Sequence, residues 1–251
     1  MRFIRSILFF FLWWSYTFIW GFVCLFTCWM PFSGRYKIAS IWARVTTGLV
    51  WVICGVKYQV KGTENFPKGP VVLLSKHQSA WETLFTMLVL PCPVSFVLKK
   101  SLLYIPFFGW VLAFLRMIPI DRGKRVNAFR QMVNIGGQRL KDGHWIMIFP
   151  EGTRVPPGTK GKYQNGGAMF AIKTKAQVIP VALNSGECWP KTTFIKTPGL
   201  ITLSFGKPIS TEGRKADELT KEVEAWIEGE MRNISPHLYP DAEPVAKPDA
   251  K

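Results

Sequence analysis

One histidine and one glutamate stand at a spacing that suits acid–base chemistry. His77 and Glu82 are five residues apart, directly after an apolar, strand-like run at residues 71–75. A carboxylate that reaches Nδ1 of an imidazole fixes the tautomer and leaves Nε2 free to accept a proton. The end of a strand that leads into a helix holds side chains at a cleft. We therefore predict that His77 is a general base oriented by Glu82, although a solvated surface pair explains the spacing alone equally well.

A second polar group follows the apolar run at residues 145–149. Residues 150–154 read P-E-G-T-R and place an acid, a hydroxyl and a guanidinium in one tight turn. A guanidinium can bind a phosphate through two parallel hydrogen bonds, which makes Arg154 a candidate phosphate ligand. Taken alone, this segment is explained better by a turn held by an ion pair between Glu151 and Arg154.

Cations flank a third segment of the chain. Lys99 and Lys100 precede a long apolar run at residues 102–115, and Asp121 and Arg122 follow it. Such a run could contact an acyl chain or a bilayer. A core helix beside a solvated ion pair is an equal alternative for this segment alone.

The hydrophobic pattern predicts the elements that would position these groups. Short apolar runs alternate with amphipathic ones along most of the chain. We predict strands at residues 71–75, 94–98, 117–120, 145–149, 178–183 and 200–205, and helices at 81–90, 125–140 and 216–231. This alternation predicts an α/β fold with helices flanking a mostly parallel sheet.

The N-terminal part of the chain is strongly apolar. No charged residue occurs at positions 6–34, and only Arg44 interrupts a second apolar stretch at positions 38–56. Each stretch is long enough to span a bilayer or to enter it and turn. We predict an N-terminal hydrophobic helix or a helical hairpin with its turn at residues 31–34. A cleaved signal peptide is the alternative, but its apolar segment is usually shorter and no small-residue cleavage site follows here.

These patterns divide the chain into three predicted parts. Residues 1–56 form the membrane-anchoring segment, and residues 57–239 form the α/β domain. Residues 240–251 are rich in Pro, Ala, Asp and Lys and form a disordered tail.

The charge and the cysteines limit the function further. The formal net charge is +16, which suits nucleic acid, an anionic bilayer or anionic substrates. No nucleic-acid recognition motif occurs, so we expect a membrane surface and no nucleic-acid partner. The five cysteines contain no C-x-x-C pair, which indicates neither a zinc site nor a disulfide framework and favours a reducing compartment.

Together, these segments resemble the four ordered motifs of the glycerolipid acyltransferases, and most closely those of the 1-acyl-glycerol-3-phosphate (lysophosphatidate) acyltransferases. The resemblance covers roughly residues 60–210, and F-P-E-G-T-R with an upstream H-x₄-acid is specific enough to outweigh the separate explanations above. The family usually has Asp where this chain has Glu82, which keeps the charge and adds one methylene group. The motifs stand here as His77 to Glu82, Lys100 to Gly109, Phe149 to Arg154, and Val178 to Val181.

The resemblance implies an activity and a set of site residues. A fatty acyl group would pass from acyl-CoA or acyl carrier protein to the sn-2 hydroxyl of 1-acyl-glycerol-3-phosphate, giving phosphatidic acid in phospholipid biosynthesis. His77 would be the general base and Glu82 its orienting carboxylate. The implied substrate-binding residues are Lys100, Arg122, Glu151, Gly152, Thr153 and Arg154.

We expect no metal and no cofactor beyond the acyl donor. No G-x-S-x-G segment occurs and no cysteine lies near His77 in the chain, which argues against an acyl-enzyme. The expected partners are membrane lipids, lysophosphatidate and the acyl donor.

The expected location is the inner cell membrane, with the catalytic domain facing the cytoplasm. Two alternatives stay open. One is acylation of another lysolipid, such as a lyso-ornithine lipid. The other is a non-catalytic lipid-binding membrane protein, which the presence of both His77 and Glu82 disfavours.

Overall fold

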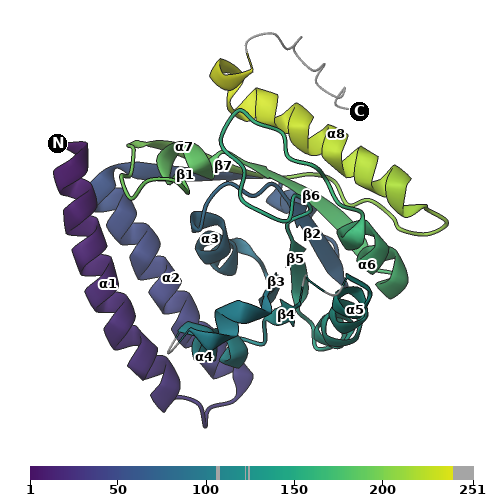
Figure 1. The fold of residues 1–251 in the computed structure, drawn as a ribbon, viewed down its shortest axis with the longest axis horizontal. Coiled ribbons are helices and arrows are strands. Elements are labelled where there is room, and N and C mark those ends of the chain that lie inside the picture. Colours follow the sequence, from purple (N-terminus) through teal and green to yellow (C-terminus); the bar gives the residue numbers. More distant parts are fainter. Residues whose placement is uncertain (106–107, 122, 124, 240–251) are drawn as a thin grey trace.

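The structure is a computed structural model that describes residues 1–105, 108–121, 123 and 125–239. Figure 1 shows a sheet with helices on both faces and a long helical hairpin at one side. Arg122 and the tail at residues 240–251 lie outside the described residues. The predicted tail and the predicted domain boundaries therefore stay predictions.

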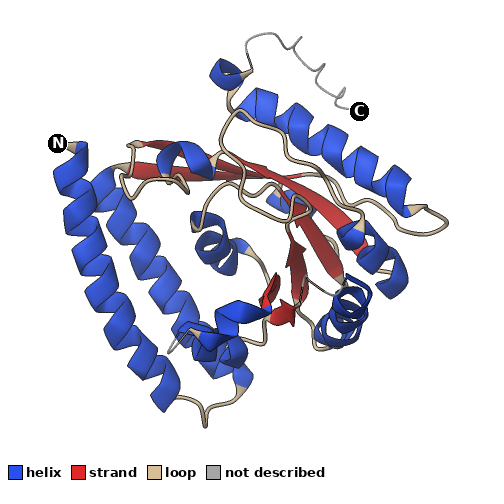
Figure 2. Cartoon of the chain, viewed as in Figure 1, coloured by secondary structure: helices blue, strands red, loops and turns tan. Residues whose placement is uncertain are grey.

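The sheet has seven strands in the order β1-β7-β6-β2-β5-β3-β4. β6, β2, β5, β3 and β4 run parallel to one another, while β7 runs antiparallel to β6 and parallel to β1 (Figure 2). This confirms the predicted α/β fold with a mostly parallel sheet. The strands are β1 (Val56–Lys61), β2 (Val71–Ser75), β3 (Val94–Lys99), β4 (Ile118–Ile120), β5 (Trp145–Ile148), β6 (Gln177–Leu183) and β7 (Gly199–Phe205).

Helices cover the two faces of the sheet and bury two hydrophobic clusters against it. α3 packs with the N-terminal helices in one cluster, and α5, α6 and α8 pack in the other. The helices are α3 (Trp81–Val89), α4 (Phe108–Phe114), α5 (Arg125–Lys141), α6 (Gly166–Thr174), α7 (Ser185–Cys188) and α8 (Ala216–Ile234). Three short 3₁₀ turns, η1 (Thr63–Asn65), η2 (Lys100–Tyr104) and η3 (Pro236–Leu238), complete the set.

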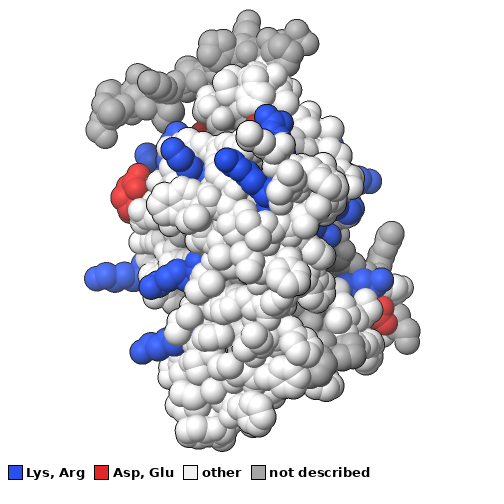
Figure 3. Space-filling view, turned by 90° about the vertical axis from the view of Figure 1, so that its left-hand side faces the viewer, with Lys and Arg blue, Asp and Glu red and all other residues white. Residues whose placement is uncertain are grey.

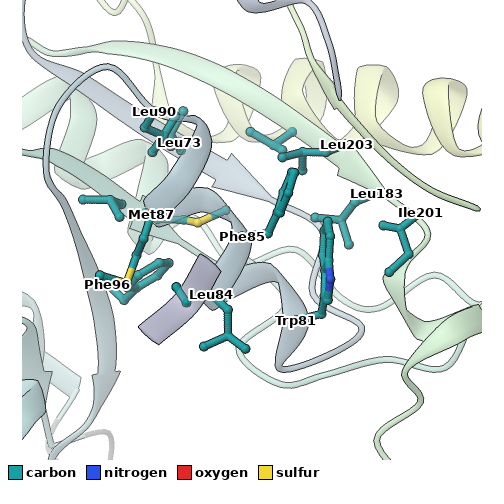
Figure 4. Packing of buried hydrophobic residues seen from close by; sticks show 14 of the residues in the cluster. Leu73, Trp81, Leu84, Phe85, Met87, Leu90, Phe96, Leu183, Ile201 and Leu203 are labelled. Carbon is teal, nitrogen blue, oxygen red and sulfur yellow. The ribbon is translucent and has the colours of Figure 1, made fainter. Parts of the chain in front are cut away.

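β2 shows why a continuous apolar run becomes a central strand. Val71 and Leu73 belong to the cluster under α3, whereas Val72 and Leu74 belong to the opposite cluster. Successive side chains of a strand point to opposite faces, so a strand with helices on both sides is apolar at every position. In Figure 4 the aromatic side chains of α3, including Trp81, lie against the strand residues of the same cluster.

The N-terminal segments form the predicted hairpin. α1 (Arg2–Phe26) and α2 (Phe32–Cys54) lie side by side (Figure 1), and Trp42 Nε1 donates to Thr17 Oγ1 at 3.0 Å across them. The connection occupies residues 27–31 rather than the predicted 31–34, because Pro31 is the N-cap of α2 and its fixed φ suits the start of a helix.

The two hairpin helices differ in how much of them is covered. Both are long and apolar enough to cross a membrane by length and composition, but only 6% of the most apolar window of α1 is buried, against 33% for α2. α2 packs on α3, and its Ala39 and Ala43 are buried in the same hydrophobic cluster as α3. α1 is therefore the outer helix, and its apolar surface faces away from the domain.

Candidate active site

Five parallel strands bring segments that are far apart in the sequence to one edge of the sheet. β6, β2, β5, β3 and β4 end at the same edge because they run in the same direction. His77 follows β2, Glu151 and Arg154 follow β5, and Lys100 follows β3. Neighbouring strands are about 4.8 Å apart, so the predicted motifs meet where α/β proteins usually bind their ligands.

His77 and Glu82 form the predicted pair. His77 Nδ1 lies 2.7 Å from Glu82 Oε2, and the His77 side chain is 18% exposed while that of Glu82 is fully buried. The imidazole stacks on Phe149, with 3.8 Å between ring centroids. Among the described residues, Nε2 has no hydrogen-bond partner. The pair is therefore arranged as a base whose free nitrogen is the one that does not contact the carboxylate.

The Glu82 carboxylate is held by the turn that precedes α3. Oε1 accepts hydrogen bonds from the backbone N–H groups of Gln78 at 2.7 Å and Ser79 at 2.6 Å, and from Ser185 Oγ at 2.7 Å. The first N–H groups of a helix and the turn before it lack intrahelical partners, so a carboxylate in the first turn satisfies them. Because these donors occupy Oε1, Oε2 is left to His77.

Glu151 faces inward, toward the main chain of His77. Its Oε2 accepts from the His77 N–H at 3.0 Å, and its Oε1 accepts from Lys76 Nζ at 2.9 Å and from the Gly161 N–H at 3.1 Å. Burial raises the pKa of the Glu151 carboxyl, and the nearby Lys76 cation opposes that rise. The explanation of this turn as an ion pair between Glu151 and Arg154 is wrong, because the buried cation beside Glu151 is Lys76.

Lys76 connects α8 to the loop at residues 76–80 between β2 and α3, which we call the catalytic loop. Its fully buried ammonium also donates to Glu228 Oε1 at 2.7 Å and to the Thr159 carbonyl at 3.0 Å. Tyr163 OH donates to the same Glu228 oxygen at 2.8 Å. Burial, and after it the charge of Glu228, raises the pKa of Tyr163, so its hydroxyl keeps the proton that it donates. All three N–H donors of Lys76 are therefore used inside the protein.

Among the residues of this network to which the sequence analysis gave no role are Lys76, Ser185 and Glu228. Lys76 stands next to His77, and Glu228 borders the apolar stripe of α8 that includes Val223, Ile227 and Met231. An acid beside a buried stripe is a weak signal of a buried partner. Ser185 has no signal of its own in the sequence.

The remaining predicted residues lie on the open side of the site. Lys100 and Thr153 are exposed, and Arg154 and Gly152 are half-buried. Within the described part of the chain, neither Lys100 nor Arg154 has a carboxylate partner. Gly152 has φ of +69°, a left-handed conformation that favours glycine and forms the turn. The substrate-binding roles of these residues stay predictions, and Arg122 lies outside the described residues.

The described residues contain no group of three or more His, Cys, Asp or Glu side chains that could hold a metal ion. The five cysteines are unpaired in the structure. The expectation that the chain needs no metal or cofactor stays a prediction.

Known proteins of one kind are similar to this chain. A family model described as Acyltransferase matches residues 57–184. A 1-acyl-sn-glycerol-3-phosphate acyltransferase of Pseudomonas aeruginosa is 43% identical over 93% of this chain and 92% of its own length. A chloroplastic protein of the same name from Arabidopsis thaliana is 30% identical over 84% of this chain and 57% of its own length.

A solved structure supports the same grouping. The crystal structure of the 1-acyl-sn-glycerophosphate acyltransferase PlsC from Thermotoga maritima has a TM-score of 0.78 and 25% sequence identity. The match covers 94% of this chain and 98% of that one, so it includes the N-terminal hairpin as well as the sheet.

Proposed function

The chain belongs to the acyltransferase family, and we propose that it transfers a fatty acyl group from a thioester donor to the sn-2 hydroxyl of 1-acyl-sn-glycerol-3-phosphate. The product is phosphatidic acid, an intermediate of phospholipid biosynthesis. The observation that carries this proposal is the His77–Glu82 pair, joined at 2.7 Å, at the same sheet edge as Lys100 and Arg154, two cations with no carboxylate partner among the described residues.

The reaction needs one base and no enzyme nucleophile. His77 Nε2 takes the proton of the acceptor hydroxyl while that oxygen attacks the thioester carbonyl. The tetrahedral intermediate then expels the thiolate, which receives the proton from the imidazolium. Glu82 stabilises the imidazolium charge and keeps Nε2 facing the acceptor. The His77 ring hydrogen-bonds to Glu82 and stacks on Phe149, so no serine or cysteine is needed to accept its proton or the acyl group.

The acceptor phosphate is positioned by cations at the open side. Arg154 offers a planar fork that matches two phosphate oxygens, and Lys100 adds a point charge from the end of β3. Holding the phosphate also holds the sn-2 hydroxyl against His77, and well-oriented reactants can gain several kcal/mol in this way. Arg122 is a further proposed phosphate ligand.

An acceptor panel tests this proposal. Detergent-solubilised full-length protein is given labelled acyl donor together with 1-acyl-glycerol-3-phosphate, lyso-ornithine lipid or lysophosphatidylcholine. We expect labelled phosphatidic acid at the highest initial rate, and none from a His77→Ala variant. Faster acylation of lyso-ornithine lipid would replace the proposed acceptor, and transfer to no lysolipid would leave a lipid-binding protein.

The donor is acyl-CoA or acyl carrier protein. Both are anionic, and the net charge of +16 suits either. Parallel assays with the same acyl chain on each donor separate them. We expect the preferred donor to show the higher kcat/KM. The unacylated form of that donor, free CoA or acyl carrier protein, should inhibit competitively because it binds the same donor site.

We further propose that the hairpin anchors the protein in the inner membrane with the catalytic domain on the cytoplasmic side. Phe11, Trp14 and Ile19 of α1 are exposed. Figure 3 shows few charged side chains over the lower part of this face, with Lys and Arg above it and at its sides. An apolar patch with a basic rim suits an anionic bilayer.

Membrane washing tests the anchor. We expect full-length protein to stay in the membrane fraction in both high salt and alkaline carbonate, because apolar contacts do not depend on ion pairing. Release by high salt alone would show that the attachment is only electrostatic. Protease added to right-side-out and inverted vesicles tests the orientation, and cleavage in the right-side-out vesicles would contradict it.

A further inference from the structure

Two buried side chains outside the family match are hydrogen-bonded to the catalytic pair or to the residue beside it. The family model ends at residue 184, whereas Ser185 begins α7 and Glu228 lies in α8. Building on the proposed function, we propose that Ser185 and Glu228 are positioning residues for the reaction. Ser185 holds the Glu82 carboxylate, and Glu228 holds the main chain of His77 through Lys76.

Ser185 acts on the carboxylate that orients the base. Its fully buried hydroxyl donates to Glu82 Oε1 at 2.7 Å, across 103 positions of the chain. The segment around it is packed tightly against the catalytic loop, because the Gly186 N–H donates to Gln78 Oε1 at 3.1 Å and a Cβ on Gly186 would lie 2.9 Å from Gln78 Cβ. Ser185 therefore has little freedom to move away from Glu82.

Glu228 acts on the residue beside the base. Lys76 stands between two carboxylates, Glu228 at 2.7 Å and Glu151 at 2.9 Å, and both Lys76 and Glu151 have fully buried side chains. The second oxygen of Glu151 accepts the His77 N–H at 3.0 Å. A chain of charge-assisted hydrogen bonds thus runs from α8 to the backbone of His77.

The same kinds of contact occur away from the site and supply matched controls. Ser204 of β7 is buried, and its hydroxyl donates to Glu230 of α8 at 2.8 Å. This pair has the chemistry of the Ser185–Glu82 contact but does not touch His77, Glu82 or Lys76. Ser204→Ala and Glu230→Gln therefore measure what the loss of a serine–carboxylate bond or of an α8 charge does without involving the catalytic loop.

The first experiment compares kcat and KM of Ser185→Ala, Ser185→Thr and Ser204→Ala. A hydrogen bond to a charged group contributes enough free energy for kcat of Ser185→Ala to fall at least about tenfold. We expect an unchanged KM for the acceptor, partial recovery of kcat in Ser185→Thr, which keeps the hydroxyl, and wild-type kcat in Ser204→Ala. Equal kcat in Ser185→Ala and wild type overturns the role of Ser185.

The second experiment compares Glu228→Gln, Lys76→Met and the double variant with Glu230→Gln. Lys76→Met leaves two buried carboxylates without their cation, so we expect kcat to fall about a hundredfold. Glu228→Gln keeps the length and the Tyr163 contact, so its loss should be about tenfold. The double variant removes one of these two unpaired carboxylates and should recover part of the kcat lost in Lys76→Met. Glu230→Gln should retain wild-type kcat.

A chemical probe separates this inference from the proposed function. Diethyl pyrocarbonate modifies unprotonated imidazole, and mass spectrometry distinguishes His77 from His144 and His237, the other histidines. We expect Ser185→Ala and Glu228→Gln to change the modification rate of His77 but not that of His237. An unchanged His77 rate together with unchanged kcat overturns the inference. If the wild type transfers no acyl group but the variants change the modification rate of His77, the proposed function is contradicted while the positioning contacts are supported.

Discussion

The sheet edge that carries the candidate active site holds two groups of charged residues, a buried group that we call the closed half and an exposed or half-buried group that we call the open half. In the closed half, Lys76, Glu82 and Glu151 are buried, and each of their charged groups is hydrogen-bonded inside the protein. In the open half, Lys100 is exposed and Arg154 is half-buried, and within the described residues neither has a carboxylate partner. Neighbouring strands thus carry buried charges that are paired and exposed or half-buried charges that are not.

This difference suggests separate roles for the two halves, orientation of the base and binding of the acceptor. Burying an unpaired charge is costly, so charges that are satisfied within the fold stay in one geometry. In the proposed mechanism, that geometry orients the base before any substrate arrives. A cation that is partly solvated and unpaired is free to bind an anion from outside. Changes in the closed half should therefore lower kcat, whereas changes in the open half should raise KM for the acceptor.

The largest expected effect comes from the pair itself. Glu82→Gln keeps the length of the side chain but removes the charge that stabilises the imidazolium, so turnover should fall about a hundredfold or more. Glu82→Asp should fall between wild type and Gln, because it keeps the charge but shortens the reach. His77→Ala should be at least as damaging as Glu82→Gln, and the double variant scarcely worse. Initial rates at saturating substrates measure the series, and a Gln variant with wild-type turnover would remove Glu82 from the mechanism.

Arg154 tests the open half. Loss of a bidentate contact with the acceptor phosphate should cost about 2 kcal/mol, or roughly thirtyfold. We expect Arg154→Ala to raise KM for 1-acyl-glycerol-3-phosphate by this factor, and Arg154→Lys to restore it only in part because the fork is lost. The measurement is a rate curve at limiting acceptor. A folded Arg154→Ala variant with unchanged KM would show that Arg154 does not bind the acceptor phosphate.

A Glu151→Gln variant distinguishes the implied role of Glu151 in the acceptor pocket from a role in holding the main chain of His77. Glu151→Gln weakens the hydrogen bonds to Lys76 and to the His77 N–H. We expect kcat to fall about tenfold with KM for the acceptor held, as for loss of a hydrogen bond to a charged group. A rise in KM with constant kcat would instead place Glu151 at the acceptor and weaken the division between the two halves.

Lys100 should show the smallest effect. Its ammonium is exposed and provides a point charge rather than a fork. We expect Lys100→Ala to raise KM for the acceptor about fivefold, the size of a surface charge contact. Added salt should raise the wild-type KM for the acceptor toward that of Lys100→Ala, because exposed charges are screened. A loss of kcat without a change in KM would show that Lys100 acts on the reaction itself.

Local sequence patterns were enough to predict most elements of the α/β domain and the His77–Glu82 pair. The nine predicted strands and helices of the α/β domain occur where their hydrophobic periods place them, because burial on one or two faces determines those periods. The edge strand β1 and the short helices α6 and α7 were not predicted, and α4 lies in the apolar run at residues 102–115, where a helix was one of two alternatives. In β1 only Val56 is fully buried, so its period is weak. His77 and Glu82 could be paired from sequence because the contact spans a single turn.

The residues that surround this pair are brought to it by long-range contacts of the fold. Lys76 could not be matched to Glu228, nor Glu82 to Ser185, because these partners lie 152 and 103 positions apart. The position of Glu228 beside the apolar stripe of α8 is a weak signal of burial, but it does not identify Lys76 as the partner. The same reason explains the false pairing of Glu151 with Arg154: sequence proximity favours a neighbour, whereas a buried carboxylate is satisfied by whichever cation and N–H groups the sheet brings to it.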